Sequence, residues 1–142
     1  MRNAIKAVNK RFGHAYEGSK FRTLLVDEDA SDVRYYYGIL HALGHEVIIA
    51  ESYAQALALL ERERFDMAVV GQGSPAFEGR EVLVHALEMN PQMPVLVVAR
   101  TLDIDCYLEA MEIGAADYLE RCAAPRDVMR SVDAHLQMKT AA

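Results

Sequence analysis

The chain has 142 residues, enough for one domain that buries its own core without disulfides or metal ions. Hydrophobic residues make up 52% and charged residues 25%, an ordinary balance for a soluble globular domain. No apolar run approaches the ~18 residues that a membrane span needs, and no signal peptide is visible. The two cysteines, Cys106 and Cys122, form no CxxC pair. We therefore expect a cytoplasmic protein that makes no contact with a membrane.

The net charge of −6 is unevenly spread along the chain. Residues 1–20 contain five basic side chains and one acidic side chain, a net charge of +4, whereas the remainder contains ten basic and twenty acidic side chains, a net charge of −10. The acidic body argues against binding to nucleic acid, whose phosphates are held mainly by Lys and Arg. The basic segment is expected to contact an anionic partner or the acidic surface of the body.

Residues 1–20 form an extension ahead of the domain proper, which we expect to span residues 21–138 with a tail at 139–142. Ile5, Val8, Phe12 and Tyr16 are spaced by three, four and four residues, which predicts a short amphipathic helix broken near Gly13. Such a helix would dock on the body or on a second copy. A partly frayed extension is the alternative.

Apolar runs rich in β-branched residues alternate with helical patterns from residue 22 onward. Asp29, Ser31 and Asp32 supply helix-start side chains before the first helix, and Gly44 closes it. The strands are predicted at residues 22–26, 47–50, 67–70, 95–99 and 117–119, and the helices at residues 33–43, 54–60, 82–87, 104–111 and 125–136.

Five strand-then-helix units predict an α/β fold with a parallel sheet, helices on both faces and right-handed crossovers. In this architecture, sites form at the carboxyl ends of the strands. The loops that follow Val26, Val70, Ala99 and Leu119 are therefore the places where functional side chains are expected.

Several local motifs, in register with these units, resemble the receiver domain of bacterial two-component response regulators. The resemblance covers about residues 22–136 and implies a flavodoxin-like (βα)5 fold with strand order 2-1-3-4-5. The motifs are LLVDED at 24–29, LGHEV at 43–47, FDMAVV at 65–70, GSP at 73–75, EG at 78–79 and GAADYL at 114–119.

The resemblance also implies a phosphoryl-transfer site. In such domains an aspartate at the end of the third strand accepts a phosphoryl group, and two acids after the first strand hold Mg²⁺. A lysine after the fifth strand stabilises the phosphoryl oxygens, and a Ser or Thr after the fourth strand detects the phosphate.

This chain departs from that pattern at four positions. The phosphoacceptor position falls on Gly71, the hydroxyl position on Ala99, the lysine position on Arg121 and the proline that follows it on Cys122. Without a carboxylate at Gly71 no acyl phosphate forms there. A cis bond before a non-proline residue costs ~3 kcal/mol, so we expect a trans peptide at Cys122. These departures predict a degenerate receiver that has lost the phosphorylation chemistry.

Only the acid pair of the family's site remains, as Asp27 and Glu28. We expect Arg100 or Arg121 to pair with these carboxylates and neutralise them without a metal ion. Weak Mg²⁺ binding by Asp27 and Glu28, with the Gly73 carbonyl as a further ligand, is the alternative, and no other cofactor is expected.

The resemblance places the interaction surface on the fourth helix, the fifth strand and the fifth helix. Tyr118 matches the aromatic residue that turns in or out in the family's switch. Ala99 leaves room for an inward ring, but without a phosphate trigger we expect the ring to pack on the strand edge. The predicted switch and interface residues are Tyr118, Ile104, Tyr107, Met111, Val128 and Val132.

The sequence therefore predicts a non-enzymatic signalling module that binds another signalling protein or a second copy of itself without phosphorylation. One alternative is a receiver that is phosphorylated on a non-standard acid, Asp27 or Glu28. Another is a pseudo-receiver that binds a small anion in the volume left by Gly71 and Ala99, near Arg100 and Arg121.

Overall fold

The computed structural model describes residues 20–121 and 123–141, with side chains described as far as Gln137. The predictions for residues 1–19 and for the peptide bond of Cys122 lie outside the described residues.

The described chain alternates strands and helices throughout. Within the described residues, no helix is both long and apolar enough to cross a bilayer. The strands are β1 (Arg22–Val26), β2 (Glu46–Ala50), β3 (Met67–Gly71), β4 (Val95–Ala99) and β5 (Asp117–Glu120). The helices are α2 (Ala30–Ala42), α3 (Tyr53–Arg62), α4 (Arg80–Met89), α5 (Ile104–Ile113) and α6 (Pro125–Ala141).

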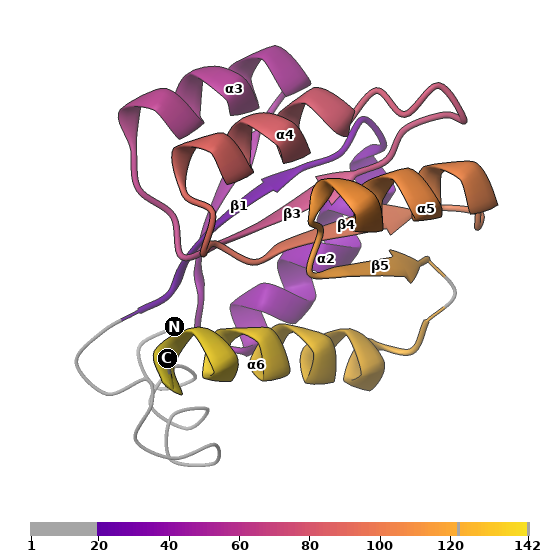
Figure 1. Ribbon diagram of the computed structural model, residues 1–142. Coiled ribbons are helices and arrows are strands. Elements are labelled where there is room, and N and C mark those ends of the chain that lie inside the picture. The colour runs from indigo at the N-terminus through magenta and orange to yellow at the C-terminus, as the bar shows by residue number, and fades with distance from the viewer. Residues whose placement is uncertain (1–19, 122, 142) are drawn as a thin grey trace.

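The five strands form one parallel sheet in the order β2-β1-β3-β4-β5. Helices α3, α4 and α5 cover one face of the sheet and α2 and α6 cover the other (Figure 1). This is the flavodoxin-like (βα)5 arrangement that the sequence predicts, and the prediction is confirmed. Strands β3 and β4 are buried along their whole length, because helices lie on both sides of them.

Each face of the sheet carries its own hydrophobic cluster. The cluster under α2 and α6 includes Val128 and Val132, whose exposed fractions are 3% and 0%. Their predicted place in an interaction surface is therefore wrong. The apolar side chains that recur at helical spacing along α6 cover the sheet, so these side chains are not available to a partner.

The first helix begins where its capping side chains predict. Asp29 is the N-cap of α2, and its carboxylate accepts hydrogen bonds from the backbone N–H groups of Ser31 and Asp32. Its own N–H donates to Asp27 Oδ1 at 2.9 Å. The cap therefore holds the end of β1 and the start of α2 in one turn, which positions the acidic residues of the site.

A buried histidine, His45, directly precedes β2 and so lies at the amino ends of the strands, away from the acidic turn. His45 is 3% exposed, its Nδ1 is 2.8 Å from Thr23 Oγ1, and its ring packs against Phe21. Burial lowers the pKa of His45 from 6.5 to about 4. Since the unfolded state binds the proton more readily, this residue's contribution to stability is present above pH 6.5 and is lost as the pH falls towards 4.

We predict that His45→Gln, which keeps a partner for Thr23 but does not titrate, removes this pH dependence. Between pH 7 and pH 5 the wild-type protein should lose on the order of 2 kcal/mol of unfolding free energy relative to the variant. Urea denaturation of both proteins at the two pH values measures this difference. An equal loss in both proteins would contradict the assignment.

Candidate functional site

Two adjoining clefts lie at the carboxyl ends of β1, β3 and β4. One has a volume of 430 Å³ and the other of 520 Å³. The predicted pocket residues Asp27, Glu28, Gly73 and Arg100 line the first cleft, and Arg100 and Arg121 line the second. The structure thus brings these predicted residues to one edge of the sheet.

The space beside Gly71 is occupied by a carboxylate. Gly71 is buried at the end of β3, and its Cα faces Asp27 at the end of β1. A Cβ atom added to Gly71 would lie 2.6 Å from both Cγ and Oδ2 of Asp27, which is closer than such atoms approach in proteins. The hollow predicted beside Gly71 is therefore filled by Asp27, and that part of the anion-pocket hypothesis is wrong.

In this position the Asp27 carboxylate is partly removed from water. The pKa of its carboxyl group is raised from 3.8 to about 6, mainly by burial and in part by the nearby carboxylates of Asp32, Asp29 and Glu28. The hydrogen bond from the Asp29 N–H acts in the opposite direction. Near neutral pH the first cleft therefore holds several carboxylates and one guanidinium, which makes it a poor site for an anion.

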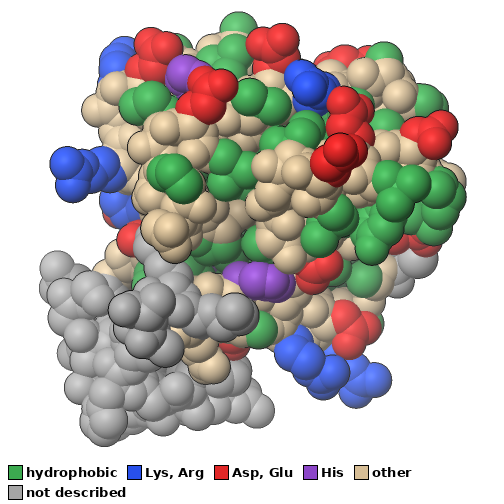
Figure 2. Space-filling model, in the orientation of Figure 1, with side chains coloured by type: hydrophobic (Ala, Val, Ile, Leu, Met, Phe, Trp, Pro, Cys, Tyr) green, Lys and Arg blue, Asp and Glu red, His purple; other side chains and the backbone are tan. Residues whose placement is uncertain are grey.

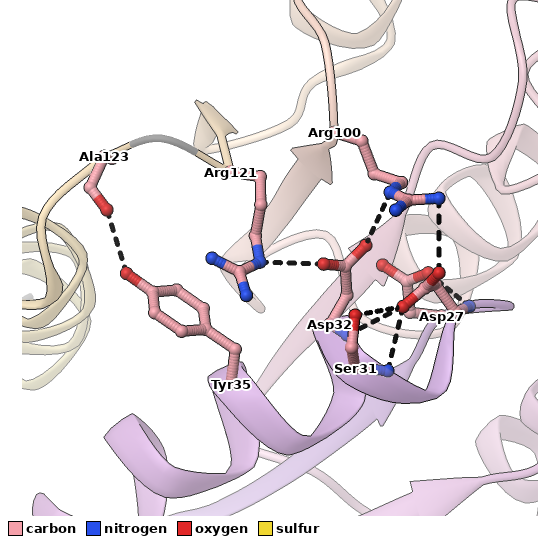
Figure 3. A network of polar contacts seen from close by, with 8 residues as sticks. Asp27, Ser31, Asp32, Tyr35, Arg100, Arg121 and Ala123 are labelled. Atoms are coloured by element: carbon pink, nitrogen blue, oxygen red, sulfur yellow. Dashed lines mark hydrogen bonds and ion pairs between the residues drawn. The ribbon is translucent and has the colours of Figure 1, made fainter.

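The two arginines pair with acids other than the expected ones. Arg121 Nε lies 2.7 Å from Asp32 Oδ1, and Arg100 lies 3.6 Å from Asp32 Oδ2 and 3.2 Å from Asp29 Oδ2 (Figure 3). The expected pairing with Asp27 and Glu28 is wrong in its partners. Asp29 and Asp32 are turned towards the arginines because both belong to the first turn of α2, whereas Asp27 is directed at Gly71.

Arg121 is held from a second side by an aromatic ring. Its guanidinium carbon lies 3.8 Å from the centre of the Tyr35 ring, and the Tyr35 hydroxyl donates to the Ala123 carbonyl at 2.8 Å (Figure 3). The planar guanidinium suits both the stacking and the ion pair, which an ammonium group would not. Arg121 therefore bridges β5 to α2 instead of extending freely into the cleft.

Tyr118 is turned inward, contrary to the strand-edge position that the sequence suggested. The ring is 8% exposed and its hydroxyl donates to Gln72 Oε1. The same hydroxyl oxygen accepts from the Asp103 N–H at 3.3 Å, and the ring packs edge-on against Tyr107. The physical reason is Gln72, which is itself 3% exposed and offers the buried hydroxyl an acceptor.

Three residues of the site were not among those predicted. Asp32 and Gln72 are buried polar residues that link the strand ends, and Tyr53 donates its hydroxyl hydrogen to the Gly71 carbonyl at 2.8 Å. A polar glutamine directly after an apolar strand was a usable signal for Gln72. Nothing in the local pattern distinguishes Asp32 or Tyr53 from ordinary residues of a helix's first turn.

The donors for a metal ion are few. Asp27, Glu28 and Gly73 share one cleft, but the third carboxylate that Gly71 would supply is missing. Across residues 20–121 and 123–141, no group of three or more His, Cys, Asp or Glu side chains is arranged to hold a metal ion. This donor set does not fit a dedicated Mg²⁺ site, which needs several oxygen ligands.

We predict that Asp27→Asn stabilises the protein above pH 6. The raised pKa means that wild-type stability falls as the pH rises from about 4 to above 6, because the folded state then holds a desolvated charge. The variant should melt at a higher temperature at pH 7.5, and the gap should narrow to less than half by pH 4.5 in thermal-unfolding measurements. Glu28→Gln, which removes the same charge from an exposed neighbour, is the control and should show a smaller gap. Equal gaps would count against a desolvated Asp27.

The fold and the site match known proteins over most of the chain. A CheY-like response regulator receiver domain from Methanospirillum hungatei superimposes with a TM-score of 0.79 and 28% identity, covering 87% of this chain and 98% of that chain. The alginate biosynthesis transcriptional regulatory protein AlgB of Pseudomonas putida is 31% identical over 118 residues, which is 83% of this chain and 26% of that protein.

The response regulator protein FleR of Pseudomonas aeruginosa is 31% identical over 114 residues, which is 80% of this chain and 24% of FleR. This chain thus spans about a quarter of the length of these curated relatives. The model of the response regulator receiver domain family matches residues 23–133. The chain therefore belongs to the receiver domain family of two-component response regulators.

Proposed function

We propose that this receiver domain acts in signal transduction through protein contacts, without phosphorylation. The observation that carries the proposal is the contact between Gly71 and Asp27. A phosphoacceptor needs a carboxylate at the end of β3 in line with the incoming phosphoryl group. This chain has only backbone there, and the space beside it is taken by the side chain of Asp27, which directly follows β1.

The groups that would respond to a phosphate are also absent or engaged. Ala99 has no hydroxyl, and Arg121 is held by Asp32 and Tyr35. Tyr118 is already inward, because Gln72 and the Asp103 N–H satisfy its hydroxyl. We propose that these contacts hold the domain in one state, so that no phosphate is needed to reach it.

The output of the domain is proposed to be a contact made by α5. Ile104, Tyr107 and Met111, which the sequence predicted as interface residues, are 58%, 39% and 37% exposed. Because Tyr107 packs on Tyr118, this surface is connected to the strand ends. The partner is another signalling protein or a second copy, by analogy with relatives described as transcriptional regulators. We propose no enzymatic activity, no nucleic-acid binding by this domain and no cofactor beyond weak Mg²⁺ at Asp27 and Glu28.

A second candidate function is phosphorylation on Asp27 itself. The specific observation in its favour is that the Asp27 carboxylate reaches the place where the Gly71 side chain would lie. Against it, Arg121 is bound to Asp32 and no hydroxyl is present at Ala99.

We predict that incubation with Mg²⁺ and acetyl phosphate leaves the intact mass of the protein unchanged. The physical reason is the missing carboxylate at the end of β3. A conventional receiver domain treated in parallel should gain one phosphoryl group. A stoichiometric adduct that hydroxylamine removes would overturn the proposal, and its loss in Asp27→Asn would assign the adduct to the second candidate.

We further predict that the Gln72–Tyr118 hydrogen bond contributes to stability as a pair. Gln72→Leu and Tyr118→Phe should each destabilise the fold by about 1–2 kcal/mol, because each leaves a buried polar partner unsatisfied. The double variant should cost about 1 kcal/mol less than the sum of the two single variants. Denaturant unfolding measures all three. Tyr107→Phe is the control, because Tyr107 is exposed, and it should leave the stability almost unchanged. Additive effects of the two single variants would refute the coupling.

A further inference from the structure

Helix α5 carries a continuous stripe of exposed apolar side chains. Ile104, Tyr107, Leu108 and Met111 follow one another at the spacing that places residues on one face of a helix, and we name this set the α5 stripe. Ile104 and Leu108 are more than half exposed, at 58% and 56%. In Figure 2 hydrophobic side chains gather at the right of the view, over α5. Stripes of this kind mark surfaces that a partner covers.

The stripe is bordered by acidic side chains. Residues 101–120 contain six Asp or Glu residues and no Lys or Arg. Asp105 and Glu112 are exposed on α5, and Glu109 pairs with Arg80 of α4 at 2.7 Å. Two such faces brought together would repel each other, which disfavours symmetric pairing through α5. The charge instead favours a partner that is both apolar and basic.

We propose that the α5 stripe is covered by residues 1–19 of the same chain. The proposal rests on the proposed function in one respect, namely that α5 is the interaction surface, and it makes residues 1–19 of the same chain, in place of an external protein, the partner on that surface. Residues 1–20 carry five basic side chains and one acidic side chain, the reverse of residues 101–120. Ile5, Val8 and Phe12 recur at helical spacing with Lys6 and Lys10 between them, so the segment supplies apolar groups for the stripe and cations for its acidic border.

The length of the segment allows this contact within one chain. Helix α5 ends at Ile113, four residues before β5 begins, so that end of the helix lies at the sheet edge where β1 starts. Strands β1 and β5 are separated by β3 and β4, which corresponds to roughly 14 Å across the sheet and about 10 Å up to the helix layer. Residues 13–19 can extend over roughly 23 Å, about the sum of these two distances, which brings residue 12 to the Ile113 end of α5.

Zero-length carbodiimide crosslinking of the full chain tests this arrangement. The chain has four lysines, Lys6, Lys10, Lys20 and Lys139, so amide crosslinks are easily assigned. We expect Lys6 and Lys10 to couple mainly to Asp105 and Glu112. Leu108→Ser on the stripe, or Phe12→Ser in the segment, should lower the yield of these crosslinks roughly fivefold, since the apolar contact is lost while both reacting groups remain.

Met89→Ser is the matched control, because Met89 is 50% exposed but lies on α4 outside the stripe. Its crosslink yield should equal that of the wild type, and circular dichroism checks that every variant is folded. The proposal is overturned if the lysines couple equally to acids elsewhere, such as Glu28 or Glu88, or if Leu108→Ser leaves the yield unchanged. It is also overturned if a mixture of light and ¹⁵N-labelled protein yields hybrid crosslinked peptides, which would place the segment on a second copy.

No phosphodonor is used in this experiment, and residues 1–19 play no part in the phosphorylation test. Failure of the crosslinks would therefore leave the phosphorylation-independent function standing with an external partner on α5. A phosphoryl adduct would overturn the proposed function without deciding what covers the stripe.

Discussion

The close approach of Gly71 and Asp27 is the constraint on which the rest of the site depends. Gly71 ends β3 and Asp27 directly follows the neighbouring parallel strand β1, so any side chain on one must share space with the other. Because Gly71 has no side chain, the Asp27 carboxylate lies against its Cα, and burial raises the pKa of that carboxylate. A carboxylate at position 71 would place a second negative charge in this desolvated space. The missing side chain of Gly71 and the burial of the Asp27 carboxylate therefore depend on each other.

The other acids of the turn are neutralised within the protein. Asp32 is buried, and its position is tolerated because Arg100 and Arg121 both lie beside it. The same contact joins the end of β5 to the start of α2, and Tyr35 adds a stacking surface for Arg121. The ion pairs of Asp32 with Arg100 and Arg121 therefore lie in the cleft where, by the family resemblance, a phosphoryl group would bind.

A separate set of contacts runs from the strand ends to the surface. Gln72 follows β3 and holds Tyr118 of β5, and Tyr118 in turn packs against Tyr107 on the exposed side of α5. Contacts with Gln72, the Asp103 N–H and the Tyr107 ring therefore hold the Tyr118 ring in one position. The position of the Tyr118 ring under α5 is therefore set by contacts outside the cleft, which is the physical basis of the proposed phosphorylation-independent function.

Strand and helix order and the parallel sheet could be predicted from the sequence, because they depend on local periodicity. The lack of a carboxylate at position 71 is read directly from the identity of Gly71. The pairing of Arg121 with Asp32, the inward ring of Tyr118 and the burial of Val128 could not be predicted. They depend on which side chains meet across β-strands and helices far apart in the chain, and helical spacing marks an apolar face without saying whether a sheet or a partner covers it. Residue identity thus determined that position 71 offers only backbone, and only the packing of β1 against β3 decided that the Asp27 carboxylate would lie against it, because strand pairing brings together residues far apart in the chain.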